Sequence, residues 1–208
     1  MLNIYKGPIT LPAFHKGNPV NQVGIVAGAF RAPELTEVYF EKNNQYKIFH
    51  NKAFADCPKL TKVLIPETIE ELREGVFENS VNLSVISENN KLPESLLKIG
   101  SSCFKGDSSS PMKVYIEELP SNLQVIGAQA FYYCSNFHLT VIPKEVSRIE
   151  SWTFSGCPNV KVTVFGNNGL NEEGDNKVTF IGQGAFYQAG NGITSIQIKS
   201  SVNKISVF

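Results

Sequence analysis

The sequence lacks net charge, long apolar runs and clustered cysteines. Lys plus Arg and Asp plus Glu number 19 each in 208 residues, so the broad positive field typical of nucleic-acid binders is missing. No apolar stretch reaches about 18 residues, so membrane insertion is not predicted. The four cysteines contain no C-x-x-C pair. They are too few to staple a fold of this size with disulfides and indicate no zinc site.

The sequence also lacks the short motifs of common active sites. It has no P-loop, G-x-G-x-x-G, G-x-S-x-G or H-E-x-x-H motif. At the start of the chain no basic segment precedes a long apolar one, so no signal peptide is predicted. The sequence is, however, 42% hydrophobic and only 18% charged, a composition that indicates a sizeable packed core.

A phrase that ends in phenylalanine recurs seven times. The residues at its end are Phe30, Phe54, Phe77, Phe104, Phe131, Phe154 and Phe186. An apolar residue stands five positions before each of them, namely Ile25, Phe49, Leu72, Ile99, Ile126, Ile149 and Ile181. The spacings of 24, 23, 27, 27, 23 and 32 residues lie within or close to the range of leucine-rich repeats. The pattern predicts a solenoid with a ladder of stacked phenylalanines.

Each unit also contains an apolar run that predicts a short strand. In "LTKVLIP" (Leu60–Pro66), alternation places Val63 and Ile65 on the core side, with Lys62 and Leu64 facing outward. A V-x-x-I segment predicts a second short strand, and glycine follows its isoleucine at an expected corner in three units: Gly100, Gly127 and Gly182. The "xxAFxxC" segment predicts a helical or 3-10 turn on the opposite side.

This phrase resembles the BspA-type leucine-rich repeat, roughly "L-x-x-I-x-I-P-x-x-V-x-x-I-G-x-x-A-F-x-x-C". The stretch "IGAQAFYYCSNFHLTVIPKEVSRI" reproduces nearly all of it, and the resemblance extends from about residue 25 to 205. It implies a β-rich, right-handed repeat solenoid with short parallel strands. It also implies a secreted or surface-attached protein of bacteria or protists that takes part in adhesion, although fold alone does not fix function.

The ends of the chain depart from the repeat. "ITLP" (Ile9–Pro12) resembles the end of a strand, so residues 1–24 are predicted to form a degenerate first repeat within a single domain. About seven repeats follow over residues 25–204, and residues 205–208 begin another unit. Because solenoids need polar terminal units, we expect either a neighbouring chain to cover the C-terminal end or the chain to be part of a longer protein with further repeats.

Candidate catalytic and metal sites are few. Cys134 and His138 could suggest a nucleophile and its base, but Cys134 shares a repeat position with Cys57 and Cys157, which predicts buried thiols. A Cys134–Cys157 disulfide is disfavoured because parallel side chains in a ladder usually lack the required torsion. The loop at Gly166–Asn176 offers Glu172, Glu173 and Asp175, but it lacks the alternating ligand spacing of calcium loops. We therefore predict a solvated turn, with no catalytic residue, metal or cofactor.

The outward strand positions are the most informative surface. In successive units they include aromatic and apolar residues where solvated strands normally carry charge, and Leu139, Val141, Val162 and Val164 are predicted to form one apolar patch. Such patches mark interaction sites, although a covering loop, a missing segment or β-propensity alone would also explain them. The candidate partner-binding residues are Tyr39, Leu64, Tyr115, Leu139, Val141, Val162 and Val164.

Taken together, these features predict a non-enzymatic module that binds a protein or glycan through its sheet face, with surface adhesion as the context implied by the resemblance. Two alternatives stay open. One is an intracellular scaffold or secreted effector, in keeping with the missing signal peptide. The other is a spacer or stalk domain of a larger surface protein. An enzyme is not expected, because no polar constellation recurs in the repeats.

Overall fold

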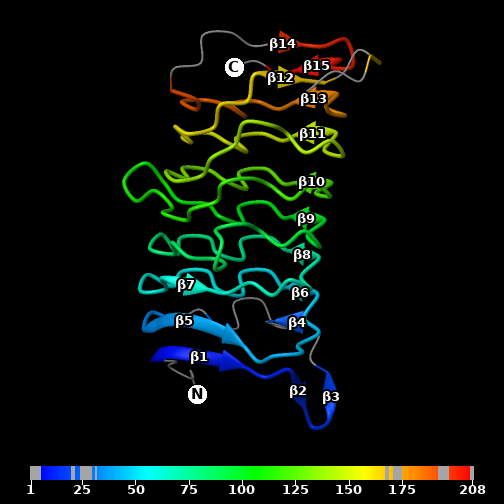
Figure 1. The fold of residues 1–208 in the computed structure, drawn as a ribbon. Helices are drawn as coiled ribbons and strands as arrows, with labels where there is room; N and C mark the ends of the chain where they lie inside the picture. The colour runs from blue at the N-terminus through cyan, green and yellow to red at the C-terminus, as the bar shows by residue number, and fades with distance from the viewer. Residues whose placement is uncertain are drawn as a thin grey trace.

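The chain forms a stack of β-rich coils that rises from the N-terminus at the bottom of Figure 1 to the C-terminus at the top. This computed structural model describes residues 6–19, 22–23, 30, 32–166, 169–170, 175–191 and 197–206. Short strands from successive coils pair in parallel and in register, as expected for units that bury their apolar faces only against neighbours. The predicted repeat solenoid with parallel strands is confirmed.

The first strand of each coil contributes to one ladder. β1 (Gly7–Leu11) pairs in parallel with β5 (Leu35–Phe40), which pairs with β7 (Lys62–Val63). Single bridges such as Lys62–Val85 and Leu139–Val160 occur farther along, and β12 (Val164–Phe165) pairs with β14 (Gln197–Ile198). The segment that sequence analysis assigned to a degenerate first unit thus contains a strand of this ladder.

The V-x-x-I segments form the second ladder, labelled down one side of Figure 1. It consists of two hydrogen-bonded sheets in succession. The first contains β4 (Gln22–Val23), β6 (Ile48–Phe49), β8 (Glu71–Leu72), β9 (Lys98–Ile99) and β10 (Val125–Ile126). The second contains β11 (Arg148–Ile149), β13 (Phe180–Ile181) and β15 (Lys204–Ile205). Val23 pairs with Phe49, whereas Ile25, the apolar residue five positions before Phe30, lies outside the described residues. Before β4, β2 (Phe14–His15) and β3 (Asn18–Pro19) form an antiparallel hairpin.

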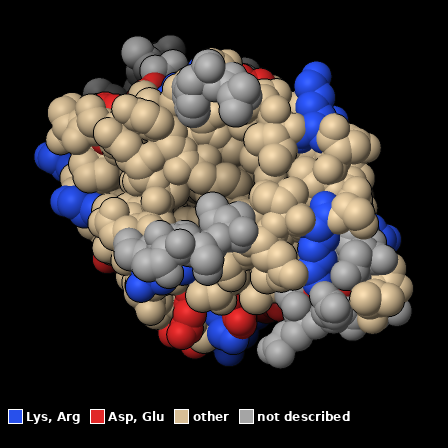
Figure 2. Space-filling view, turned by 90° about the horizontal axis from the view of Figure 1, so that it is seen from above, with Lys and Arg blue, Asp and Glu red and all other residues tan. Residues whose placement is uncertain are grey.

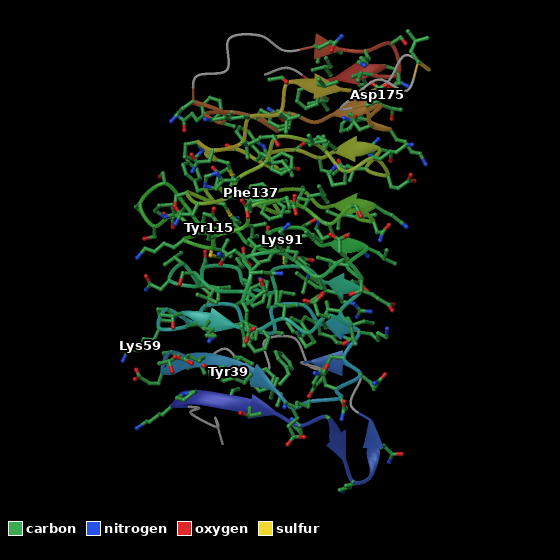
Figure 3. All side chains as sticks on the ribbon, viewed as in Figure 1. Tyr39, Lys59, Lys91, Tyr115, Phe137 and Asp175 are labelled. Atoms are coloured by element: carbon green, nitrogen blue, oxygen red, sulfur yellow. The ribbon has the colours of Figure 1, made fainter. Side chains whose placement is uncertain are left out.

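The seven phenylalanines form one continuous stack through the core. Neighbouring ring centroids from Phe30 to Phe186 lie 5.2–5.8 Å apart. The five inner rings are fully buried, whereas Phe30 and Phe186 at the ends are partly buried. Phe137 adds a further ring 4.2 Å from Phe131, and it lies near the middle of the stack in Figure 3. The predicted phenylalanine ladder is confirmed.

The small residue three positions after the ladder phenylalanine ties adjacent coils together. The Cys57 thiol donates to the Phe30 carbonyl at 3.0 Å, and Cys134 and Cys157 make the same bond one coil below themselves, to the carbonyls of Phe104 and Phe131. Ser80 donates its hydroxyl to the Phe54 carbonyl at 2.6 Å. The position therefore favours a short side chain that both fills space and pairs a buried carbonyl.

The turns that carry the ladder phenylalanines are not helical, so the predicted helical or 3-10 turns are not seen in the described residues. The residues two before and two after the phenylalanine usually have positive φ, as at Gln129 (58°) and Tyr133 (52°) around Phe131. As a result, alternate N–H groups point along the stack: the N–H of Phe131 donates to the Thr153 carbonyl of the next coil at 3.0 Å. A helix would direct these donors to its own carbonyls, whereas here they form a third ladder between coils.

Glycine at the corner after the second strand allows neighbouring coils to approach closely. A Cβ on Gly127 would lie 2.3 Å from the Ser101 backbone nitrogen, and Gly100 and Gly182 face backbone atoms at 2.5 Å. None of the three has positive φ. Glycine is therefore required at these three positions because the backbones of neighbouring coils meet there. This confirms the predicted corner and gives its cause.

The C-terminal end of the stack presents an uncharged centre. Viewed from above in Figure 2, Lys, Arg, Asp and Glu lie mainly around the rim, while other residues fill the middle. A hollow of about 380 Å³ at this end is lined by residues that include Phe165, Phe186 and Ile198. Ile198 and Ile205 are 45% and 49% exposed.

Candidate functional site

The outer side of the first strand ladder contains a hollow at its N-terminal half. It has a volume of about 470 Å³ and lies where the strands of three coils end, with Tyr39 and Leu64 in its lining. Phe40, Ile65 and Pro66 add apolar surface. The polar lining consists of carboxylates, amides and one hydroxyl: Asn44, Glu67, Ser87, Glu88 and Asn89. We call this the strand-end groove.

Tyr39 is held in place on both sides. Its hydroxyl donates to the Glu37 carboxylate, and the Lys62 ammonium lies 5.2 Å from the centroid of its ring. The hydrogen bond to Glu37, together with burial, raises the pKa of Tyr39 above its usual value, so the phenol stays protonated at neutral pH. Tyr39 thus presents a fixed, partly exposed ring from β5 (Figure 3).

The loop on the far side of the groove is ordered by its own hydrogen bonds. The Ser87 hydroxyl donates to Asn89 Oδ1 at 2.9 Å, and the Lys91 backbone N–H donates to both of these side chains. On the near side, Asn44 Nδ2 donates to the Glu41 carbonyl at 2.9 Å. Both polar margins are therefore fixed by local bonds, and the groove has a defined shape.

Tyr115 lies higher in the stack than Tyr39 (Figure 3), and its ring contacts His138, which was not among the predicted partner-binding residues. Its ring centroid is 5.3 Å from that of His138, with the rings tilted by 50°. The His138 N–H donates to the Ile116 carbonyl at 2.8 Å, which fixes it beside the preceding coil. The outward aromatic side chain of Tyr115 could have indicated a contact with the next coil. The sequence does not specify which residue of that coil, here His138, faces outward beside it.

The predicted apolar patch is not formed, because Leu139 and Val162 face the core. Each is only 2% exposed, and Thr140 and Thr163 are exposed in their place. The expected register assigns the two threonines to the core. Burying the neighbouring apolar side chain instead avoids enclosing a hydroxyl. The predicted outward orientation of Leu139 and Val162 is therefore wrong, whereas Val141 is 55% exposed and Val164 is partly exposed.

The cysteines do not form a reactive site. None of the four forms a disulfide and all are buried, and burial raises the pKa values of the Cys103 and Cys134 thiols well above the usual value. The Cys134 thiol donates to the Phe104 carbonyl at 3.0 Å. The His138 ring instead lies against that of Tyr115 on the strand side. A buried, protonated thiol is inert as a nucleophile, so the structure gives no support to a Cys134–His138 dyad.

No cluster of three metal-ligating side chains occurs in the described part of the chain. In the loop at Gly166–Asn176, Asp175 forms a buried ion pair with Lys199, and the Asn176 amide bonds to the backbone of Val164 and Gly166. Glu172 and Glu173 lie outside the described residues. The carboxylate of Asp175 therefore serves the packing of this coil on the next. Among the described residues there is no helix long and apolar enough to span a membrane.

Comparison with known families agrees with this architecture. The family model described as "BspA type Leucine rich repeat region (6 copies)" matches residues 23–161 and 88–208 of the chain. The chain belongs to the BspA-type leucine-rich repeat family. This membership and the solenoid support a repeat module for interaction with other molecules, and the family is typically non-enzymatic.

Solved structures of leucine-rich repeat proteins share the fold at low sequence identity. A leucine-rich repeat protein of T. pallidum is 22% identical with a TM-score of 0.64, over 88% of this chain and 78% of that one. A leucine-rich repeat protein from Bacteroides ovatus is 16% identical with a TM-score of 0.52, over 100% of this chain and 70% of that one. No curated protein matches the sequence.

Proposed function

We propose that this BspA-type solenoid is a non-enzymatic binding module that captures a protein partner through its strand face, with the strand-end groove as the main contact. The context that we propose is adhesion at the cell surface or outside the cell, as the family resemblance implies. The observation that carries the proposal is the groove, because it combines a fixed aromatic ring and an apolar floor with ordered polar margins.

The chemistry of the groove favours a cationic segment with an apolar side chain. Leu64, Ile65 and Pro66 would contact the apolar side chain, and the ring of Tyr39 is an anchor of the kind enriched in binding hot spots. The lining includes the carboxylates of Glu67 and Glu88 and contains no Lys or Arg. A Lys or Arg on the partner would therefore meet complementary charge, which favours specificity and the rate of association.

Selection from a random dodecapeptide display library on the immobilised full chain tests this proposal. We expect enriched peptides to combine an aromatic or aliphatic residue with Lys or Arg. Leu64→Lys should weaken a selected synthetic peptide at least about tenfold, which corresponds to about 1.4 kcal/mol. Leu97→Lys is the matched control, because Leu97 is an exposed leucine beside β9 in the other ladder.

Two results would contradict the proposal. One is that no peptide sequence is enriched on the wild-type chain. The other is that the selected peptides lose affinity for the Leu97→Lys variant while they still bind the Leu64→Lys variant. Surface labelling tests the cellular context separately. Antibodies should label intact source cells, and labelling that requires lysis would argue for the intracellular alternative.

A further inference from the structure

The turn face of the stack changes character along its length. We define it by the four positions that lie two and three residues before, and one and two residues after, the ladder phenylalanine. In the coils of Phe54, Phe77 and Phe104 these twelve positions include five charged residues: Lys52, Asp56, Glu74, Glu78 and Lys105. In the coils of Phe131, Phe154 and Phe186 none is charged. This uncharged half holds three of the seven tyrosines and the only tryptophan of the chain.

The aromatic residues in question are Tyr132, Tyr133, Trp152 and Tyr187, and we call them the turn-face aromatic cluster. Tyr132 and Tyr133 meet edge to face with centroids 4.7 Å apart, and Trp152 and Tyr187 do so at 6.0 Å. The Tyr133 hydroxyl donates to Gln188 Oε1 at 3.2 Å, two coils farther along. The cluster therefore spans three successive coils.

Two rings of the cluster lie directly on glycine backbone. A Cβ on Gly156 would lie 2.6 Å from Cδ1 of Tyr133, and a Cβ on Gly184 would lie 2.6 Å from Cε3 of Trp152. Tyr133 and Trp152 also have positive φ, 52° and 60°, a conformation that is costly for bulky residues. The coil stack therefore holds both rings in fixed orientations, so that binding a ligand would cost little side-chain entropy.

The cluster remains accessible. Tyr187 is 48% exposed, and Tyr132, Tyr133 and Trp152 are partly exposed.

Ser155 occupies the same turn position as Tyr132 and Tyr187, in the coil between theirs. It is fully buried, and its hydroxyl has no hydrogen-bond partner among the described residues. Such an unpaired buried group is rare in a packed protein.

We propose that the turn-face aromatic cluster binds a neutral saccharide. The C–H face of a sugar ring stacks on an aromatic plane, and the sugar hydroxyls bond to neutral donors and acceptors. Gln129, Gln183 and Gln188, together with the tyrosine hydroxyls, supply such groups in the same twelve positions. No charged side chain there would select an acidic or amino sugar.

Other classes of ligand fit these positions less well. They contain no Leu, Ile, Val or Met, so the aliphatic anchors of a protein interface are missing. They contain no Lys or Arg either, and single-stranded nucleic acids need cations along their backbone in addition to stacking rings. The site is distinct from the strand-end groove in both residues and chemistry.

Affinity electrophoresis tests the proposal with native gels that contain one neutral polysaccharide each: glycogen, mannan, xyloglucan or β-galactan. We expect at least one of them to retard the full chain. Tyr187→Ala should weaken retardation at least about tenfold in apparent Kd, because Tyr187 is the most exposed ring of the cluster. Trp152→Phe keeps a ring over Gly184 and should reduce affinity less. Tyr39→Ala, in the strand-end groove, should leave retardation unchanged.

The single tryptophan provides a second readout in solution. Oligosaccharides of the retarding polysaccharide should change the emission of Trp152 with the same apparent Kd. Absence of retardation by all four polysaccharides would overturn the proposal, as would retardation that survives Tyr187→Ala. A third overturning result would be display-selected peptides that require Tyr187, since that would assign the cluster to a protein partner. None of these outcomes depends on Leu64, so failure here is separable from failure of the strand-end groove.

Discussion

Replacing Phe131 with alanine removes the ring at the centre of the phenylalanine stack. Phe131 is fully buried and contacts three other rings, with centroids at 5.5 Å (Phe104), 5.8 Å (Phe154) and 4.2 Å (Phe137). Loss of the buried apolar surface alone should cost about 2–3 kcal/mol. The neighbouring coils are joined by backbone hydrogen bonds above and below, so they cannot collapse fully into the space. A residual cavity of about 50–100 Å³ would add about 1–2 kcal/mol.

We therefore expect Phe131→Ala to lower the free energy of unfolding by about 3–5 kcal/mol. Urea titration followed by circular dichroism and by the emission of Trp152 measures this loss. Tyr132→Ala is the matched control, because its ring is adjacent in sequence but partly exposed, and it should cost less than about 1 kcal/mol. A loss below about 1 kcal/mol for Phe131→Ala, or an equal loss for both variants, would refute the argument that the stacked rings carry the core.

Three further predictions concern bonds between coils. Cys134→Ser should be more stable than Cys134→Ala in urea titration, because serine can keep the bond to the Phe104 carbonyl, as Ser80 does to the Phe54 carbonyl. Alanine would leave the Phe104 carbonyl unpaired, at a cost of about 1–3 kcal/mol. Equal stability of the two variants would argue against this bond. Gly127→Ala should cost about 1–3 kcal/mol or more, since its Cβ would meet backbone that cannot move aside, and a neutral result in the same titration would argue against the close corner. Burial and the Arg73 guanidinium lower the pKa of His50 below its usual 6.5. Its contribution to stability is therefore present above about pH 6.5 and is lost as pH falls through the lowered value. The drop in urea midpoint between pH 7.5 and 5 should be smaller in His50→Gln, and an unchanged drop would exclude His50 as a cause.

The sequence was sufficient to predict the solenoid and its phenylalanine ladder. The reason is that each rung depends on two large apolar residues at a fixed separation, and substitutions at either would expose the core. The small position was also predictable as an inward-facing site at Cys134. Its hydrogen bond to the carbonyl of the preceding coil was not predictable. Serine takes the same position at Ser80, but two small side chains at one position are also explained by packing alone.

Two features could not be predicted from the repeat alone. Threonine at Thr140 and Thr163 occupies a position that is apolar in the other coils, and the choice between burying it or its neighbour depends on packing with adjacent coils. The "xxAFxxC" segments were expected to form helical or 3-10 turns, yet Lys52 and Gln129 adopt positive φ. Bonds to the next coil stabilise that conformation, and such non-local partners leave little trace in a local pattern.

Because every coil pairs with the next, the stack gains little length for each residue of the chain. Phe54 and Phe77 are 23 residues apart in sequence, yet one coil advances the stack by only about 4.8 Å. An extended linker would cover that distance with about two residues. A protein whose role is to span a distance would gain little length from each added coil. Each added coil does, however, extend the strand and turn faces by several side chains. The architecture therefore suits a protein that must present area rather than span distance, which weighs against a role as a mere stalk.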